Sequence, residues 1–189
     1  MRVILATEPA HLEAALALRF AVFVGEQGVS PEGERDALDQ APDTVHFLAL
    51  SGGGPCFGGP GDVVGVGRLL GPRADGHPHI GRVAIARDRR RSGIGRALMD
   101  AIEREALARF GEGGAVTVAL SAQVQAIPFY EAIGYVIAGE PYLDEGIWHR
   151  DGTKVVRDPE ADGSGPSGTA PRDFARRAPG QRRRRTPQA

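Results

Sequence analysis

The sequence predicts a mixed α/β domain, in which helices cover the faces of a central sheet. Short apolar runs rich in β-branched residues alternate with segments of helical periodicity, and segments dense in turn residues separate them. Two expected strands come one after the other in the first half of the chain, and strands and helices alternate after them. This order is typical of a mixed sheet that is flanked by helices.

The first half of the chain contributes one helix and four strands to this prediction. The helix runs from a cap at Thr7 to about Phe23 and tolerates Pro9 in its first turn. The strands are short apolar runs, and a loop rich in glycine and proline separates the second from the third. We expect these strands at residues 3–6, 45–50, 63–70 and 79–86.

The second half contributes two helices and further strands. In the longer helix, apolar residues recur at every fourth position, and the polar residues fall mostly elsewhere, which indicates a surface helix on a sheet. The apolar set is Ile94, Leu98, Ile102, Ala106 and Phe110, and the polar set is Asp100, Glu103, Arg104 and Arg109. A strand follows at 115–120, then a short helix over about 124–133 that ends at Gly134 and has Pro128 in its first turn. Strand-like segments at 135–140 and 148–156 close the domain.

Length and composition favour one folded domain, residues 1–157, followed by a disordered tail, residues 158–189. The tail has five prolines, four glycines, seven arginines and Phe174 as its only aromatic residue. Its net charge is +3, which leaves about −4 on the domain. The arginines at 182–185 can meet nucleic acid or another acidic surface, and a solvated tail is the alternative.

The remaining bulk features describe a cytoplasmic protein. A single cysteine, Cys56, rules out a disulfide within the chain, and its Gly/Pro-rich surroundings suggest no catalytic role. The first residues lack the apolar stretch of a signal peptide, and no segment approaches the roughly twenty apolar residues of a membrane span. We therefore expect a soluble protein of the cytoplasm with no membrane partner.

The stretch RRSGIGRALMDAIEREA, residues 90–106, places two glycines and several arginines where the long helix begins. A helix N-terminus has free backbone N–H groups and a partial positive charge, and glycines let an anion approach that backbone. A plain turn, a nucleic-acid patch and a cradle for a small anion are the three interpretations. The Lys-Ser/Thr pair of a P-loop is absent, and Leu98 stands where a dinucleotide fold needs its third glycine.

This stretch resembles motif A of the GCN5-related N-acetyltransferases (GNAT), in which a strand leads through Arg/Gln-x-x-Gly-x-Gly/Ala into a helix. Arg90, Gly93 and Gly95 match its defining positions. AQVQAIPFYEAIGY, residues 122–135, is similar to motif B, with Phe129, Tyr130, Glu131, Gly134 and Tyr135 in its pattern. LRFAVFVGEQGV and LDEGIWH are similar to segments of the ElaA-like subgroup, although Trp148 replaces a proline there.

The resemblance implies a GNAT fold: a mixed sheet of six to seven strands flanked by helices, with a splayed pair of parallel strands. It implies an N-acetyltransferase that uses acetyl-CoA as cosubstrate and no metal. The pantetheine arm would pair with the backbone of Val83, Ala84 and Ile85, and the N–H group near Val83 would polarise the thioester carbonyl. Gln123, in the place of a frequent Asn, and Phe129 would also contact the cofactor. The pyrophosphate would lie on Arg90, Arg91, Ser92, Gly93, Ile94, Gly95 and Arg96.

The resemblance also places the catalytic acid at Tyr130, whose hydroxyl would protonate the leaving thiolate; packing against the cofactor is the alternative role. Acids at 32–43 would attract a cationic amine, unless they form a solvated loop. Glu26, Glu34, Asp39 and His149 are the expected substrate residues, and Asp36 and His46 are further candidates for the general base. The acceptor stays open among small amines, amino sugars, polyamines and protein amino groups, and dimers are frequent among similar enzymes.

Two other functions compete with this one. A CoA-binding regulatory module would bind the cofactor without turnover, which the tyrosine at the family's acid position disfavours. A nucleic-acid-binding protein would use the arginines at 87–96 and 182–185. The acidic domain and the lack of aromatic residues among the arginines speak against that function.

Overall fold

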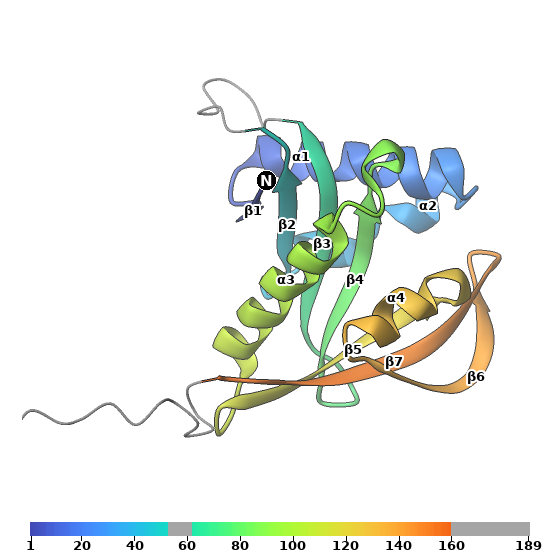
Figure 1. Cartoon of the computed structure of the whole chain (residues 1–189). Coiled ribbons are helices and arrows are strands. Elements are labelled where there is room, and N and C mark those ends of the chain that lie inside the picture. Colours follow the sequence, from blue (N-terminus) through green and yellow to red (C-terminus); the bar gives the residue numbers. More distant parts are fainter. Residues whose placement is uncertain (53–61, 160–189) are drawn as a thin grey trace, which may run out of the picture.

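The computed structural model describes residues 1–52 and 62–159. Cys56 and most of the predicted tail, residues 160–189, lie outside this described part of the chain. Within it, one seven-stranded sheet has the strand order β1-β2-β3-β4-β5-β7-β6 (Figure 1). The strands are β1 (Arg2–Leu5), β2 (Val45–Leu50), β3 (Val63–Pro72), β4 (Pro78–Ile85), β5 (Ala115–Gln123), β6 (Val136–Asp144) and β7 (Ile147–Arg157).

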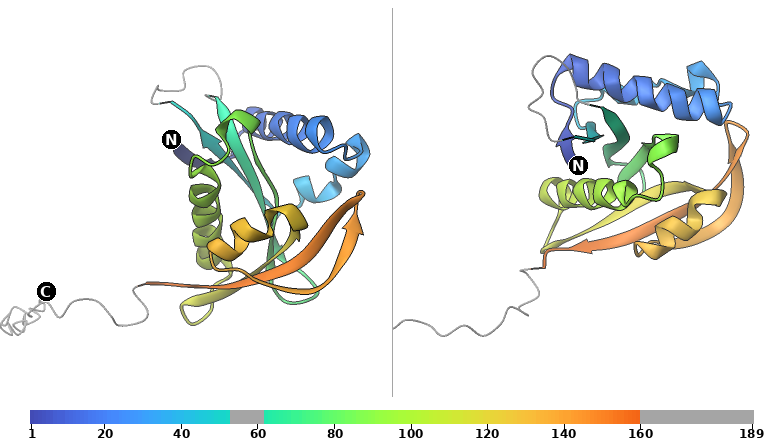
Figure 2. Two further views of the ribbon diagram at one scale, coloured as in Figure 1. Left: turned by 45° about the vertical axis from the view of Figure 1, so that its right-hand side comes forward. Right: turned by 45° about the horizontal axis from the view of Figure 1, so that its top comes forward.

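Helices cover both faces of the first half of the sheet (Figure 2). α3 (Ile94–Phe110) packs with Val45 and Phe47 of β2, whereas α1 (Pro9–Arg19) packs with Leu48 and Leu50 of the same strand. Successive residues of a strand point to opposite faces, so β2 is buried on both sides. This explains why the strand is apolar at nearly every position instead of alternating.

The expected mixed α/β fold is confirmed, and two details of it are corrected. α1 begins at Pro9 after Glu8, with no side-chain cap, so Thr7 does not cap the helix; a π-helical segment, Phe20–Glu26, continues it. Glu103 of α3 is 5% exposed instead of lying on the polar surface. Its carboxylate accepts hydrogen bonds from the Tyr135 hydroxyl (3.1 Å) and the Lys154 ammonium (2.6 Å), which compensate for its burial.

The remaining helices are short. α2 (Pro31–Glu34) lies after the π-helical segment, and α4 (Ile127–Ala132) lies between β5 and β6. Pro128 occupies the first turn of α4, as expected, and Gly134 follows the helix with φ of +95°. Among the described residues, no helix combines the length and the apolar character that a membrane span requires.

Candidate active site

β4 and β5 are the only parallel neighbours in the described sheet, and they separate soon after they meet. His79 pairs with Ala119 and Ile80 with Leu120, and the ladder stops there. Figure 1 shows the two strands in contact at one end and apart at the other. The rest of β4, from Gly81 to Ile85, therefore presents an unpaired backbone edge toward β5, to which an extended ligand can add as a strand does.

A β-bulge lies on β4 at the point where the strands separate. Val66 of β3 pairs with Ala84 and Arg68 pairs with Gly81, so two β4 residues, Arg82 and Val83, oppose a single residue of β3. Arg82 adopts a positive φ of 53°. Bulges redirect the backbone and disturb the ladder, and Arg82 and Val83 are the residues affected here.

The glycine turn at the start of α3 has the geometry of an anion site. Arg91 and Gly93 have φ of +64° and +84°, and Gly93 precedes the helix without a side-chain cap. The first backbone hydrogen bond of the helix runs from Ala97 N to Gly93 O, at 3.1 Å. The N–H groups of Ile94, Gly95 and Arg96 precede it and have no partner within the helix. Together with the helix dipole they favour a phosphate group.

The arginines of this turn are used in different ways. Arg90 donates to Ile85 O at 3.1 Å and to Glu26 at 2.8 Å, and it thereby links the turn to the π-helical segment. Arg96 donates to Ala132 O at the end of α4, at 3.1 Å. Both side chains therefore have protein partners, and the free backbone N–H groups remain the main feature for an anion.

Tyr130 of α4 is buried, with 9% of its surface exposed, and its ring makes edge contacts with Phe129 and Tyr135. Among the described residues, none hydrogen bonds to its hydroxyl. Burial raises the pKa of Tyr130 to about 12, because the phenolate loses hydration. The hydroxyl stays protonated at neutral pH and can only act there as a proton donor.

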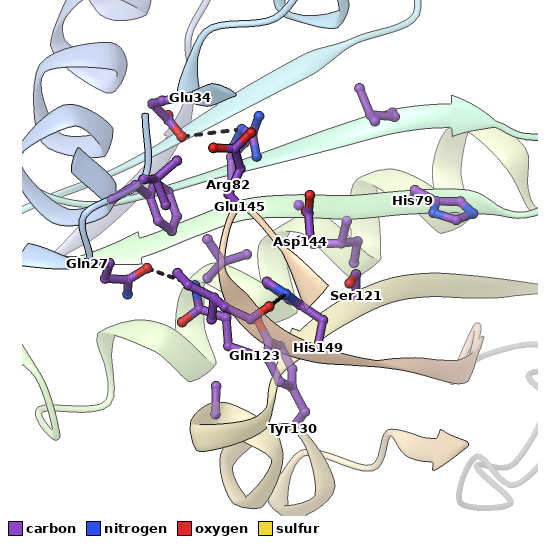
Figure 3. Close-up of a pocket in the computed structure, with 18 residues that line it drawn as sticks. Gln27, Glu34, His79, Arg82, Ser121, Gln123, Tyr130, Asp144, Glu145 and His149 are labelled. Atoms are coloured by element: carbon purple, nitrogen blue, oxygen red, sulfur yellow. Dashed lines mark hydrogen bonds and ion pairs between the residues drawn. The ribbon is translucent and has the colours of Figure 1, made fainter. Parts of the chain in front are cut away.

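A pocket of about 260 Å³ lies between β4, β5, the α1–α2 region and the β6–β7 turn (Figure 3). Tyr130, Val83 and Arg82 line it, together with two residues expected at the substrate site, Glu34 and His149. A third expected substrate residue, Glu26, lies outside this lining and forms an ion pair with Arg90. The pocket therefore joins the bulge of β4, the candidate acid and one candidate base.

His149 of β7 is 9% exposed and lies against Tyr142 in a stacked arrangement. Its Nδ1 is 2.9 Å from Ile147 O. A carbonyl oxygen only accepts hydrogen bonds, so Nδ1 carries the hydrogen and the neutral ring has its lone pair on Nε2. Among the described residues, none bonds to Nε2, which is therefore free for a ligand.

Gln123, expected at the cofactor, forms hydrogen bonds with two other glutamines. Its Nε2 donates to Gln27 at 2.8 Å (Figure 3). Its Oε1 accepts from Gln125 at 3.0 Å. Gln27 follows the π-helical segment, so this contact joins the N-terminal helical region to β5. The side chain of Gln123 has a structural role in addition to any contact with a ligand.

The acidic segment 32–43 is folded onto three buried or half-buried arginines. Arg19 binds Glu34 and Asp39, Arg68 binds Asp36 and Asp39, and Arg82 binds Asp36 at 3.0 Å and approaches Glu34 at 3.5 Å. The alternative of a solvated loop is therefore wrong for these three carboxylates, which pair with arginines. Asp39 lies outside the pocket lining, whereas Glu34 is part of it.

The arginines and burial shift the titration of these groups in opposite directions. Asp39 is desolvated, yet its hydrogen bonds with Arg19 and Arg68 outweigh burial and hold its pKa at about 2. Burial dominates at Glu34 and raises its pKa in spite of Arg19. His46, whose Nε2 contacts Asp39 O at 3.1 Å, has its pKa lowered by burial. Neither Asp36 nor His46 lines the pocket.

Two further contacts at the site had no signal in the sequence. Ser121 Oγ lies 2.5 Å from the Tyr142 hydroxyl, which donates to Asp151 at 2.8 Å, so β5, β6 and β7 are linked beside the pocket. Ser30 donates to Glu145 at 2.9 Å, across 115 positions of the chain. Only the alternation of strand residues could have suggested the first contact, because Ser121 faces Asp151 across β5 and β7.

Comparison with known proteins agrees with this architecture. The family model for the acetyltransferase (GNAT) domain matches residues 56–155. The uncharacterized N-acetyltransferase YjcF of Bacillus subtilis is 34% identical over 150 residues, which cover 79% of this chain and 96% of that protein. Two solved structures are also similar. An acyl-CoA N-acyltransferase from Pseudomonas aeruginosa has a TM-score of 0.68 and 31% identity, and covers 81% of this chain and 98% of its own. Escherichia coli ElaA has a TM-score of 0.67 and 25% identity, with the same coverage of both chains.

These findings define the class of the protein as an acyltransferase that uses acyl-CoA and an acceptor substrate. The chain belongs to the GNAT family. The described residues contain no group of His, Cys, Asp or Glu that could hold a metal ion.

Proposed function

We propose that this protein is an acetyl-CoA-dependent N-acetyltransferase, and that it transfers the acetyl group directly to a primary amine. The observation that carries the proposal is the pocket beside the free edge of β4, into which two polar groups without protein partners are directed. These groups are the Tyr130 hydroxyl and the Nε2 of His149. One is a proton donor and the other is a proton acceptor, which are the two functions that amide formation from an amine requires.

The residues present fit a CoA thioester. The N–H groups that begin α3 suit its pyrophosphate, and the backbone of Val83, Ala84 and Ile85 suits the extended pantetheine arm. Ile85 O already accepts from Arg90, and its second lone pair can take a further bond. Acetyl-CoA supplies an activated carbonyl carbon at the pocket, and Val83 N–H donates to the carbonyl oxygen as that oxygen gains charge.

His149 is assigned as the general base. A primary amine with a pKa near 10.4 is mostly an ammonium ion at neutral pH, and it must lose a proton before its nitrogen can bond to carbon. The Nε2 lone pair accepts that proton, while the hydrogen bond from Nδ1 to Ile147 O fixes the ring. The proton then leaves His149 to solvent, and the nitrogen loses its second proton by the same route once the carbon–nitrogen bond has formed, which leaves the neutral amide.

Tyr130 is assigned as the general acid. When the carbon–sulfur bond breaks, the sulfur takes the hydroxyl proton of Tyr130 and leaves as a thiol, and Tyr130 regains a proton from solvent. The high pKa of Tyr130 keeps this proton in place before the reaction. Acetyl is proposed as the group transferred because a pocket of about 260 Å³ must accommodate the amine as well as the acyl group.

Initial rates of thiol release from acetyl-, propionyl- and hexanoyl-CoA over a panel of amines test the proposal. We expect acetyl-CoA to have the highest kcat/KM, and double-reciprocal plots to intersect, as they do when both substrates are bound before reaction. Thiol release that no amine accelerates would contradict amine transfer. Parallel plots would contradict direct transfer.

A further inference from the structure

The β6–β7 turn contributes two carboxylates, Asp144 and Glu145, to the pocket lining. Glu145 is held in place by Ser30, whose hydroxyl donates to it at 2.9 Å. Its carboxylate also lies directly against Gly33 of α2, where an added Cβ would overlap it. In Figure 3, Glu145 and Asp144 lie on the side of the pocket away from Tyr130. The carboxylates and the proposed acid therefore occupy different ends of one cavity.

Among the described residues, no lysine or arginine forms an ion pair with either of these two carboxylates. The arginines beside the pocket, Arg19, Arg68 and Arg82, are balanced by the acids of segment 32–43, which supply three negative formal charges: Glu34, Asp36 and Asp39. No ion pair joins Asp144 or Glu145 to any Arg or Lys of residues 1–52 and 62–159.

The formal charge of the lining is consequently negative. Arg82 is the one Lys or Arg among the lining residues, and it donates to Gly33 O at 2.9 Å and to Asp36 at 3.0 Å. His79 also lines the pocket, but its Nε2 pairs with Asp75 at 2.9 Å. With Glu34, Asp144 and Glu145 negative and Arg82 positive, the lining has a net formal charge of −2.

The cavity also has the character of a ligand site independently of these acids. Tyr130 and His149 are each 9% exposed, and each directs into the cavity a polar atom that no described residue satisfies. Polar atoms without protein partners, on largely buried side chains that line a cavity, are typical of a ligand site. The proposed reaction places the reacting nitrogen of the acceptor at this end.

We propose that the acceptor is an amine with a second positive charge, of the diamine or polyamine class. This inference rests on the proposed function and specifies its substrate. The reacting nitrogen lies at Tyr130 and His149, and the distal ammonium group lies at Asp144 and Glu145. The same carboxylates repel acceptors with a carboxylate or phosphate at the distal end.

Two matched sets of acceptors isolate the distal charge at constant chain length. One set is putrescine, butylamine and γ-aminobutyrate, and the other is cadaverine, pentylamine and δ-aminovalerate. Transfer from acetyl-CoA to each is measured as thiol release and as product mass. We expect kcat/KM to be at least about tenfold higher for the diamine than for the monoamine, and lower again for the amino acid. The difference lies mainly in KM and decreases with added salt.

Variants of Asp144 then assign the preference to this end of the pocket. In Asp144→Asn the advantage of the diamine falls several-fold while transfer to the monoamine is retained, and Asp144→Lys moves the preference toward the amino acid. Glu140→Gln removes an exposed acid of β6 outside the pocket lining and keeps the wild-type order.

The outcomes separate the two proposals. Equal kcat/KM for diamine and monoamine would overturn the proposal that the acceptor carries a second positive charge. A preference for the diamine that Asp144→Lys leaves unchanged would overturn it as well. Both results leave the N-acetyltransferase proposal standing. Transfer that is fastest to the amino acids overturns the second positive charge in the same way. Thiol release that none of the six amines accelerates overturns the diamine proposal, and the wider panel of amines then decides the N-acetyltransferase proposal separately.

Discussion

Gly95 of α3 and Phe129 of α4 pack so closely that a Cβ at residue 95 would lie 3.2 Å from the edge of the ring. This contact joins the glycine turn to the helix that carries Tyr130. Gly95 therefore serves packing between two parts of the site, while the positive φ of Gly93 serves the backbone conformation of the turn. The two positions of this short motif thus require glycine for two different physical reasons.

Replacement of Gly95 by valine should displace the Phe129 ring and destabilise the protein by about 1–3 kcal/mol, the usual effect of overpacking. Phe129→Ala makes room for the new side chain. We therefore expect the double variant to lose at least about 1 kcal/mol less than the sum of the single variants, measured by urea unfolding. Gly95→Val combined with Phe110→Ala, at the far end of α3, is the control and should be additive. Additivity in the Gly95–Phe129 pair would contradict the contact.

The elements that the sequence predicted well are those with a local signal. The apolar spacing of α3, the buried run of β2, and Gly134 after α4 each reflect constraints within one segment. The glycine turn was recognisable because both of its determinants, free N–H groups and small residues, lie within six positions. The resemblance of a short motif pointed to Tyr130, which lines the pocket, and its role as the acid stays a prediction.

The features that the sequence did not predict depend on partners far away in the chain. Arg19 belongs to a helix and Asp39 to an acidic segment, and neither shows in its own neighbourhood that the two will meet in the interior. Glu103 has the spacing of a residue on the polar face of its helix, and only the fold brings its partner Lys154 close to it. A charged residue has the same local pattern whether solvent or a buried partner compensates it, so only the fold distinguishes the two cases.

The anion site at the glycine turn predicts a charge-specific effect at residue 93. Gly93→Glu should weaken CoA binding about 100-fold or more, because a carboxylate would take the place of the phosphate. Gly76→Glu is a matched control, since Gly76 also has a positive φ with open space around its Cα. Both substitutions cost similar strain, of about 1–2 kcal/mol, and only the first lies in the turn. Titration calorimetry with CoA measures the difference, and equal affinities for the two variants would contradict the site.

Removal of the Tyr130 hydroxyl should affect the chemical step alone. Tyr130→Phe is expected to lower kcat about 100-fold while the Kd for acetyl-CoA stays near the wild-type value. Since burial raises the pKa of Tyr130 to about 12, the wild-type acid keeps its proton throughout the neutral and mildly alkaline range. Stopped assays of thiol release, together with equilibrium binding, separate the two quantities. A kcat that stays at the wild-type value would rule out Tyr130 as the acid.

The ion pairs of Asp39 should make the free energy of unfolding depend on pH in the acidic range. Its pKa is about 2 in the folded protein and 3.8 when unperturbed, so the lowered value stabilises the fold at higher pH by about 2 kcal/mol. This contribution is complete above about pH 4 and is lost as the pH falls toward 2. Asp39→Asn should cost about 3 kcal/mol at pH 7, and its difference from the wild type should shrink between pH 4 and pH 2 in urea unfolding. The exposed Asp88→Asn variant is the control, with a small effect at every pH. A penalty for Asp39→Asn that is constant with pH would contradict the role of the ion pair.

The base assignment of His149 predicts a changed dependence on amine ionisation. His149→Asn keeps a side-chain N–H that can donate to Ile147 O, but it lacks the Nε2 lone pair. The variant reacts only with amine that has already lost its proton in solution. Its kcat/KM should therefore fall about 100-fold at pH 7 and then rise about tenfold per pH unit toward pH 9. The wild type, which removes the proton in the site, should rise less steeply. His77→Asn, in the turn before β4 and outside the pocket lining, should follow the wild-type profile. Parallel profiles for His149→Asn and the wild type would show that another group, or solvent alone, removes the proton.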